Sequence, residues 1–109
     1  MAKAASKSKA AVKARTKTVA YDVAEQLRTP EEAAAYLDAW LEEAPEDAGG
    51  ISRALGDIAR AKGMTQVARD AGLSRESLYK ALGENGNPSF ATVLKVARAI
   101  GIKLHAEAA

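Results

Sequence analysis

Two short helical segments separated by a tight turn constrain the fold of this chain more than any other feature. Capping and spacing signals predict one helix over residues 66–71 and a second that begins after Ser74 and runs to about residue 82. Gly72 lies in the turn between them, four residues after Ala68, and readily takes the left-handed conformation that reverses the chain. A small side chain is needed at Ala68 because the second helix crosses close to it. This layout predicts a helix-turn-helix within an all-α bundle.

The outward residues of this helix pair have side chains that suit a DNA groove. Leu73 and Leu78 are expected to fill the space between the helices, so the rest of the second helix points outward. Arg75 can contact guanine edges or phosphates, Glu76 can accept a hydrogen bond from cytosine, and serine hydroxyls can donate to phosphates. Thr65 is expected to be the N-cap of the first helix. The candidate DNA-binding residues are Thr65, Gln66, Ser74, Arg75, Glu76, Ser77, Tyr79 and Lys80. The alternative interpretation is a plain helical hairpin with a solvated outer face.

Two further helices are expected around this pair. Gly49 and Gly50 are expected to break the chain before a helix that starts near Ile51 and ends at Gly63, which is placed as a left-handed cap. A loop rich in glycine and asparagine leads to Ser89, the expected N-cap of the last helix. The apolar face expected for that helix consists of Phe90, Val93, Leu94, Ala97 and Ile100.

The segment after the last helix alternates apolar and polar residues. Residues 102–106 are therefore expected to form a short strand or an extended dimer arm. Ile102 and Leu104 are the candidates for a dimer surface in that segment.

A strong helix start signal lies upstream, at Thr29. Pro30 follows at the first helical position and Glu32 three residues after the cap, so the threonine and glutamate side chains can each satisfy a free backbone amide. The helix predicted from there is acidic and must end near Pro45. Its apolar stripe consists of Ala33, Tyr36, Leu37, Trp40, Leu41 and Ala44. This stripe either packs on the rest of the domain or offers an aromatic anchor to a partner protein. The candidate partner contacts are Tyr36, Leu37, Trp40 and Leu41.

The charges are divided into three blocks along the chain. The formal charge is +6 over residues 1–17, −8 over 18–47 and +4 over 48–109, although the net charge is only +2. Residues 1–18 lack the apolar side chains that a core needs, so they are expected to be a disordered basic tail. That tail is either an arm that binds phosphates nonspecifically or a solvated extension. The expected organisation is the tail, an acidic helical segment over 19–48 and a DNA-binding domain over 49–109.

Composition excludes several classes of function. The 109 residues are enough for one small domain, and the absence of cysteine excludes disulfides, thiolate nucleophiles and cysteine-ligated metals. The single histidine, His105, has no evident catalytic partner, and no phosphate-binding or dinucleotide-binding glycine motif is present. No apolar run is long enough to span a membrane, and the basic N-terminus lacks the apolar stretch of a secretory signal. We therefore expect a cytoplasmic protein that is not an enzyme and binds no cofactor or metal.

The same motifs resemble a known family. Residues 63–82, 86–90 and 93–96, together with the signal that starts at Thr29, resemble the addiction-module antidote proteins over about residues 19–104. Members of this family are small bacterial antitoxins with a lambda-repressor-like DNA-binding domain. Many such domains carry a phosphate-contacting glutamine four residues before the motif alanine, where this chain has Met64. Thr65 and the amides of the first turn could take over that contact.

The resemblance implies a function and its partners. It implies that the chain binds and neutralises a RelE-like toxin, typically a ribosome-dependent mRNA endonuclease encoded beside it. It also implies a homodimer that binds double-stranded operator DNA and represses the shared promoter. An acidic helix would suit a toxin that must be basic to bind RNA.

The sequence is also compatible with three other interpretations. A stand-alone phage-type transcriptional repressor would have the same helix pair but no toxin, and it would keep the acidic helix on its own core or dimer interface. A nucleoid-associated protein would depend on the lysine-rich tail and bind DNA without sequence preference. An enzyme is disfavoured by the absence of a catalytic constellation.

Overall fold

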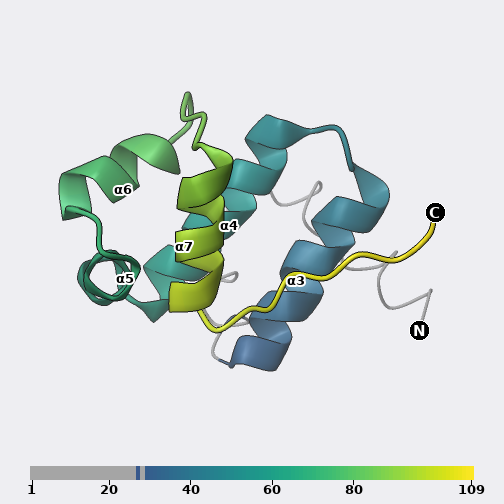
Figure 1. Ribbon diagram of the computed structural model, residues 1–109, viewed down its shortest axis with the longest axis horizontal. Helices are drawn as coiled ribbons and strands as arrows, with labels where there is room; N and C mark the ends of the chain where they lie inside the picture. Colours follow the sequence, from purple (N-terminus) through teal and green to yellow (C-terminus); the bar gives the residue numbers. More distant parts are fainter. Residues whose placement is uncertain (1–26, 28) are drawn as a thin grey trace.

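The computed structural model describes Leu27 and residues 29–109, and this part of the chain is all-helical. The helices are α3 (Pro30–Glu43), α4 (Ala48–Lys62), α5 (Met64–Ala71), α6 (Arg75–Ala81) and α7 (Phe90–Ala99). In Figure 1, α4 lies in the middle behind α7, with α3 on one side and α5 and α6 on the other. The expectations for residues 1–18 lie outside the described residues. The expected all-α fold class is confirmed.

The start of α3 is fixed by the local signal in the sequence. Glu32 donates its backbone N–H to Thr29 Oγ1 at 3.1 Å, and Thr29 donates its N–H to Glu32 Oε1 at 3.1 Å. This reciprocal capping satisfies two amides that the helix itself leaves free, and Pro30 occupies a position where no amide is needed. The predicted capping box is therefore confirmed.

The expected chain break at Gly49 and Gly50 is wrong. Helix α4 begins at Ala48, and Asp47 caps it by accepting a hydrogen bond from the Gly50 N–H at 2.8 Å. Gly50 is buried where α4 approaches α3, and a methyl group there would overlap the ring of Trp40 and the Asp47 carboxylate. The second glycine thus permits close packing of two helices.

These two neighbouring glycines are expected to respond oppositely to alanine. At Gly50, the methyl group must displace either the Trp40 ring or the capping carboxylate, so the free energy of unfolding should fall by about 1–2 kcal/mol. At Gly49, the nearest atoms are 3.7 and 3.8 Å away, and alanine favours the helix, so stability should rise by about 0.5 kcal/mol. Urea denaturation of the two variants checks this. Equal changes in stability in the two variants would show that the space at Gly50 does not limit how closely α3 packs on α4.

The junction of α4 and α5 is tighter than expected. Gly63 ends α4 and also precedes the first residue of α5, with φ 116° and ψ 111°. Its φ is positive, but this is not the left-handed helical cap that the sequence pattern predicts. Thr65 lies inside α5, whose N-cap position is occupied by Gly63 and has no side-chain hydrogen bond. The expected Thr65 cap is therefore wrong, because the helix starts two residues earlier than predicted, at Met64.

The core lies between α4, α5, α6 and α7 and extends to α3. Its largest fully buried side chains are Ile58, Leu78, Leu82, Val67 and Val96. Small residues such as Ala54, Ala59 and Ala68 are also buried and allow the helices to approach closely. A core built from aliphatic side chains and alanine follows from the low aromatic content of the chain.

The expected apolar face of α7 is partly wrong. Phe90 is 72% exposed and Leu94 45% exposed, whereas Val96 and Ala99 are buried. The side of α7 that contacts α5 and α4 is centred on Val96 and Ile100, so Phe90 and Leu94 lie on its flank. Periodicity identified an apolar stripe, but the neighbouring helices select which part of it is buried.

The segment after α7 follows α3. Residues 102–109 have no regular secondary structure, and the expected short strand is not formed in the described part of the chain. Ile102 donates its backbone N–H to Ala97 O at 2.9 Å and reaches the core, whereas Leu104 is 39% exposed. Figure 1 shows this segment crossing in front of α3 on its way to the C-terminus. Ile102 thus anchors the segment to the core without a paired strand.

Candidate functional site

The turn between α5 and α6 has the geometry that the sequence predicts. Gly72 adopts φ 72° and ψ 31°, the left-handed conformation, and its N–H donates to Arg69 O at 3.2 Å. Leu73 donates its N–H to Ala68 O at 2.9 Å, which closes the end of α5. Ala68 is buried. The two short helices are therefore held in a fixed relative orientation by a turn of three residues.

The first turn of α6 is capped by serine. Ser77 donates its backbone N–H to Ser74 Oγ at 2.9 Å, and the Ser74 hydroxyl donates to Ser77 Oγ at 2.8 Å. Both side chains are exposed, so the pair also presents hydroxyl groups to the solvent. The predicted Ser74 cap is confirmed.

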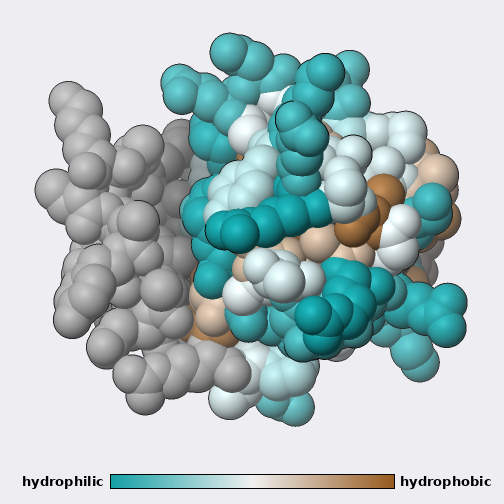
Figure 2. Space-filling view, turned by 90° about the vertical axis from the view of Figure 1, so that its left-hand side faces the viewer, coloured by the Kyte–Doolittle hydropathy of each residue, from teal (hydrophilic) through white to brown (hydrophobic). Residues whose placement is uncertain are grey.

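All eight candidate DNA-binding residues are exposed. They come from the start of α5 and from α6 with its cap. Arg75 lies over the Tyr79 ring, with the guanidinium carbon 5.4 Å from the ring centroid, and donates from Nη2 to Tyr79 Oη at 3.4 Å. Gln66 donates from Nε2 to Asp70 Oδ1 at 3.0 Å. Figure 2, which faces this side of the molecule, shows mostly hydrophilic side chains with a hydrophobic patch between them.

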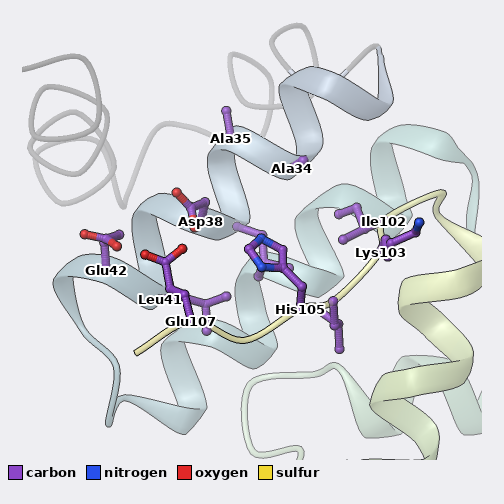
Figure 3. A pocket seen from close by; sticks show the side chains of 11 residues that line it. Ala34, Ala35, Asp38, Leu41, Glu42, Ile102, Lys103, His105 and Glu107 are labelled. Carbon is purple, nitrogen blue, oxygen red and sulfur yellow. The ribbon is translucent and has the colours of Figure 1, made fainter. Parts of the chain in front are cut away.

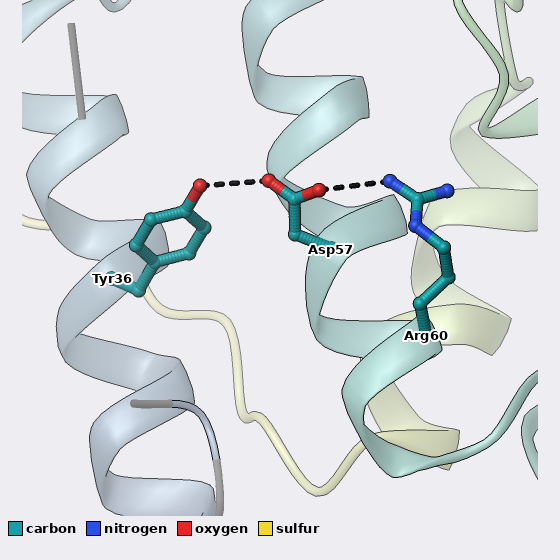
Figure 4. Close-up of polar contacts among 3 residues, drawn as sticks. All are labelled: Tyr36, Asp57 and Arg60. Carbon is teal, nitrogen blue, oxygen red and sulfur yellow. Dashed lines mark hydrogen bonds and ion pairs between the residues drawn. The ribbon is translucent and has the colours of Figure 1, made fainter. Parts of the chain in front are cut away.

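The acidic helix is joined to the rest of the fold by a polar contact. Tyr36 donates from its hydroxyl to Asp57 Oδ2 at 2.8 Å, and Arg60 donates to Asp57 Oδ1 at 2.8 Å (Figure 4). Burial raises the pKa of Tyr36 well above its usual range, and the negative charge of Asp57 raises it further. One carboxylate thus connects a tyrosine of α3 to an arginine of α4.

Removing the Tyr36 hydroxyl is expected to weaken the contact between α3 and α4. Tyr36→Phe should lower the free energy of unfolding by about 1–2 kcal/mol near neutral pH, because Asp57 loses a hydrogen bond. In the wild type, tyrosine in the unfolded chain ionises from about pH 10, while folded Tyr36 keeps its proton. The stability that Tyr36 contributes is therefore fully present below pH 10 and is lost as the pH rises further. The difference in the free energy of unfolding between the wild type and Tyr36→Phe should therefore decrease above pH 10.

Urea titrations of the wild type and of Tyr36→Phe at pH 8 and at pH 11 measure this difference in the free energy of unfolding. Tyr79→Phe is the matched control, because it removes a hydroxyl from an exposed tyrosine on α6. A difference in stability of the same size at both pH values would contradict the role assigned to the Tyr36 hydroxyl.

The four candidate partner contacts on α3 lie in different environments. Leu37 is only 4% exposed and belongs to the core, so it presents almost no surface to a partner. Tyr36 and Trp40 are half-buried and pack towards α4, through Asp57 and Gly50 respectively. Leu41 is 41% exposed. The aromatic pair thus faces the chain's own core, and the free surface of α3 lies elsewhere on the helix.

That free surface forms one wall of a groove of about 400 Å³. Residues 102–107 form the opposite wall (Figure 3). The α3 side contributes Ala34, Ala35, Asp38, Leu41 and Glu42. The other side contributes Ile102, Lys103, Leu104, His105 and Glu107. The sequence identifies Leu41 and Leu104 as separate candidates but does not show that they line the same groove. No local sequence signal indicates that the C-terminal segment follows α3.

The described residues offer no obvious metal centre or membrane span. No group of three or more histidine and carboxylate side chains is placed to hold a metal ion in this part of the chain. None of its helices is both long and apolar enough to cross a membrane.

Comparison with known proteins identifies the family of this helical domain. Residues 17–108 match the family described as "probable addiction module antidote protein", and the chain belongs to this family. It is 52% identical over 87 residues to an uncharacterized protein of Haemophilus influenzae strain Rd, and this match spans 80% of the chain and 88% of that relative. No solved structure shows significant similarity. The resemblance carried by the sequence motifs is therefore confirmed at the level of the family.

Proposed function

We propose that this protein is the antitoxin of a type II toxin–antitoxin module. It neutralises a RelE-like toxin by binding it, and it represses its own operon by binding operator DNA as a homodimer. Membership of the antidote family over residues 17–108 is the observation that carries the proposal. The α5–α6 surface and the acidic α3 supply the two binding functions that such a protein needs.

The α5–α6 pair supports the DNA-binding half of the proposal. A short helix that exposes Arg75, Glu76 and Lys80 on a rigid turn is suited to the major groove, where such side chains distinguish base pairs. The start of α5, with Thr65 and Gln66 exposed, would lie against the phosphate backbone. Two copies on a palindromic operator would place their recognition helices about 34 Å apart.

The charge of residues 18–47 supports the toxin-binding part of the proposal. Residues 18–47 carry a net charge of −8, and a toxin that cleaves mRNA needs a basic surface to bind it. Figure 1 shows α3 on the opposite side of α4 from α6. Toxin and operator would therefore occupy different sides of the molecule.

A stand-alone phage-type repressor is the second candidate. The observation in its favour is that Tyr36 and Trp40 pack towards α4 rather than outward, as a helix that serves only its own fold would place them. This candidate shares the α5–α6 surface but needs no toxin.

Bacterial growth separates the two candidates. The small reading frame next to this gene is induced alone and then together with the full chain. Growth arrest that the chain relieves, with both proteins co-purifying, is the expected result. If neither neighbouring frame arrests growth, the antitoxin role is wrong and the stand-alone repressor takes its place. Protection of a promoter fragment by the purified chain tests the DNA-binding half independently.

A further inference from the structure

We propose that the groove between α3 and residues 102–107 is the surface on which the toxin docks, through a basic segment that carries apolar side chains. This inference rests on the antitoxin function proposed above and assigns that function to a particular place. It replaces the aromatic pair Tyr36 and Trp40 as the expected contact.

The groove has an apolar floor that the fold leaves open. Leu37 from α3 and Ile102 from the other wall line it where it meets the core, and both are almost fully buried. Leu41 and Leu104, one from each wall, keep 41% and 39% of their surface exposed. Exposed leucines on both sides of one groove are costly in water, and burying them under a partner would recover that free energy.

The rim of the groove is acidic. Asp38 and Glu42 lie one turn apart on α3, and Glu107 lies on the other wall; Figure 3 shows the three carboxylates gathered towards one end. None of the three forms an ion pair or hydrogen bond with another described residue. Lys103 is the one lysine or arginine lining the groove in the described part of the chain. The groove therefore repels nucleic acid and attracts a cationic partner.

The position of the groove suits an antitoxin that also binds DNA. Both of its walls, α3 and the C-terminal segment, lie across α4 from α6 (Figure 1). A protein seated there would leave the exposed residues of α6 free for the operator. Neutralisation and repression would then not compete for the same residues.

Charge reversal in the groove tests the proposal. The double variant Asp38→Lys/Glu42→Lys, in the full chain, should lower the affinity for the purified product of the neighbouring reading frame by about 100-fold, because two attractive charges become repulsive. Leu41→Ala should lower it by about 10-fold through lost apolar contact. Titration calorimetry measures both changes. Operator binding and the circular dichroism spectrum should be unchanged, since all three positions are exposed.

The matched control is Glu46→Lys/Glu84→Lys. It makes the same change in net charge at two exposed positions outside the groove. Its affinity for the toxin should stay within about threefold of the wild-type value if attraction is local rather than general. An equal loss in both double variants would overturn the proposal, since the effect would then come from overall charge.

Two other occupants of the groove are distinguished by the same experiments. If deletion of residues 1–17 abolishes toxin binding while the groove variants bind normally, the basic tail holds the toxin and the proposal is wrong. If the groove variants change the oligomeric state but not toxin affinity, the groove holds a second copy of the chain and the proposal is also wrong. In both cases a wild-type chain that still relieves growth arrest keeps the antitoxin function intact.

Discussion

Replacing Leu78 by alanine is expected to lower the free energy of unfolding by about 2–5 kcal/mol. Leu78 is completely buried, and it is the one buried residue within the seven-residue helix α6. Its removal leaves a cavity between α6 and the rest of the core, and so short a helix has little stability of its own. Small domains are stable by only about 5–15 kcal/mol, so this loss is a large part of the free energy that keeps the domain folded.

Fluorescence of Trp40, the single tryptophan, reports this unfolding in urea. Leu94→Ala is the matched control, since it removes the same atoms from a leucine that is 45% exposed on α7. Its stability should change by less than about 1 kcal/mol. Similar losses in the two variants would contradict the view that Leu78 anchors α6. Loss of operator binding is expected in Leu78→Ala in proportion to the unfolded fraction.

Replacing Arg75 by alanine is expected to reduce operator affinity by about 1–3 kcal/mol, or roughly 5- to 150-fold, with a much smaller loss on random DNA. Arg75 is exposed, so the fold should tolerate the change. Its guanidinium lies over the Tyr79 ring, which limits the freedom of the side chain before DNA arrives. A base contact made by such an arginine discriminates between sequences, whereas a phosphate contact does not.

Mobility-shift titrations on the promoter fragment and on a scrambled fragment of equal length measure this difference. Lys103→Ala is the control, because it removes one positive charge from the groove side of the molecule, across α4 from α6. Lys103→Ala should change little the affinity for the promoter fragment and for the scrambled fragment. Equal losses on the two DNAs in Arg75→Ala would assign the residue to the phosphate backbone.

The sequence predicts well the features that depend on residues a few positions apart. The capping box at Thr29, the Ser74 and Ser89 caps and the left-handed Gly72 are all confirmed. Each is determined by one side chain or one backbone angle acting on amides within the next turn. The six candidates on α6 and its cap are expected at the surface and lie there, and the DNA-binding role of all eight candidates stays a prediction.

The features that sequence reasoning missed depend on contacts between distant segments. Gly50 looks like a helix breaker until Trp40, ten residues earlier, is placed against it. Phe90 and Leu94 look buried until the positions of α4 and α5 select the other side of α7. The groove could not be predicted because it needs the course of residues 102–107 along α3. Periodicity shows how many faces are apolar but not which neighbour covers each one.

The way α6 is held has a consequence for how such a protein can diversify. Its exposed residues contribute little to the core, while Leu78 alone inserts from the helix into it. With the DNA-binding role proposed above, mutations at Arg75, Glu76 or Tyr79 would change the preferred DNA sequence with little penalty in folding. Under that proposal, new operators would become accessible through neutral substitutions on one helix face, and paralogous modules in one genome would become independent of each other with the same fold.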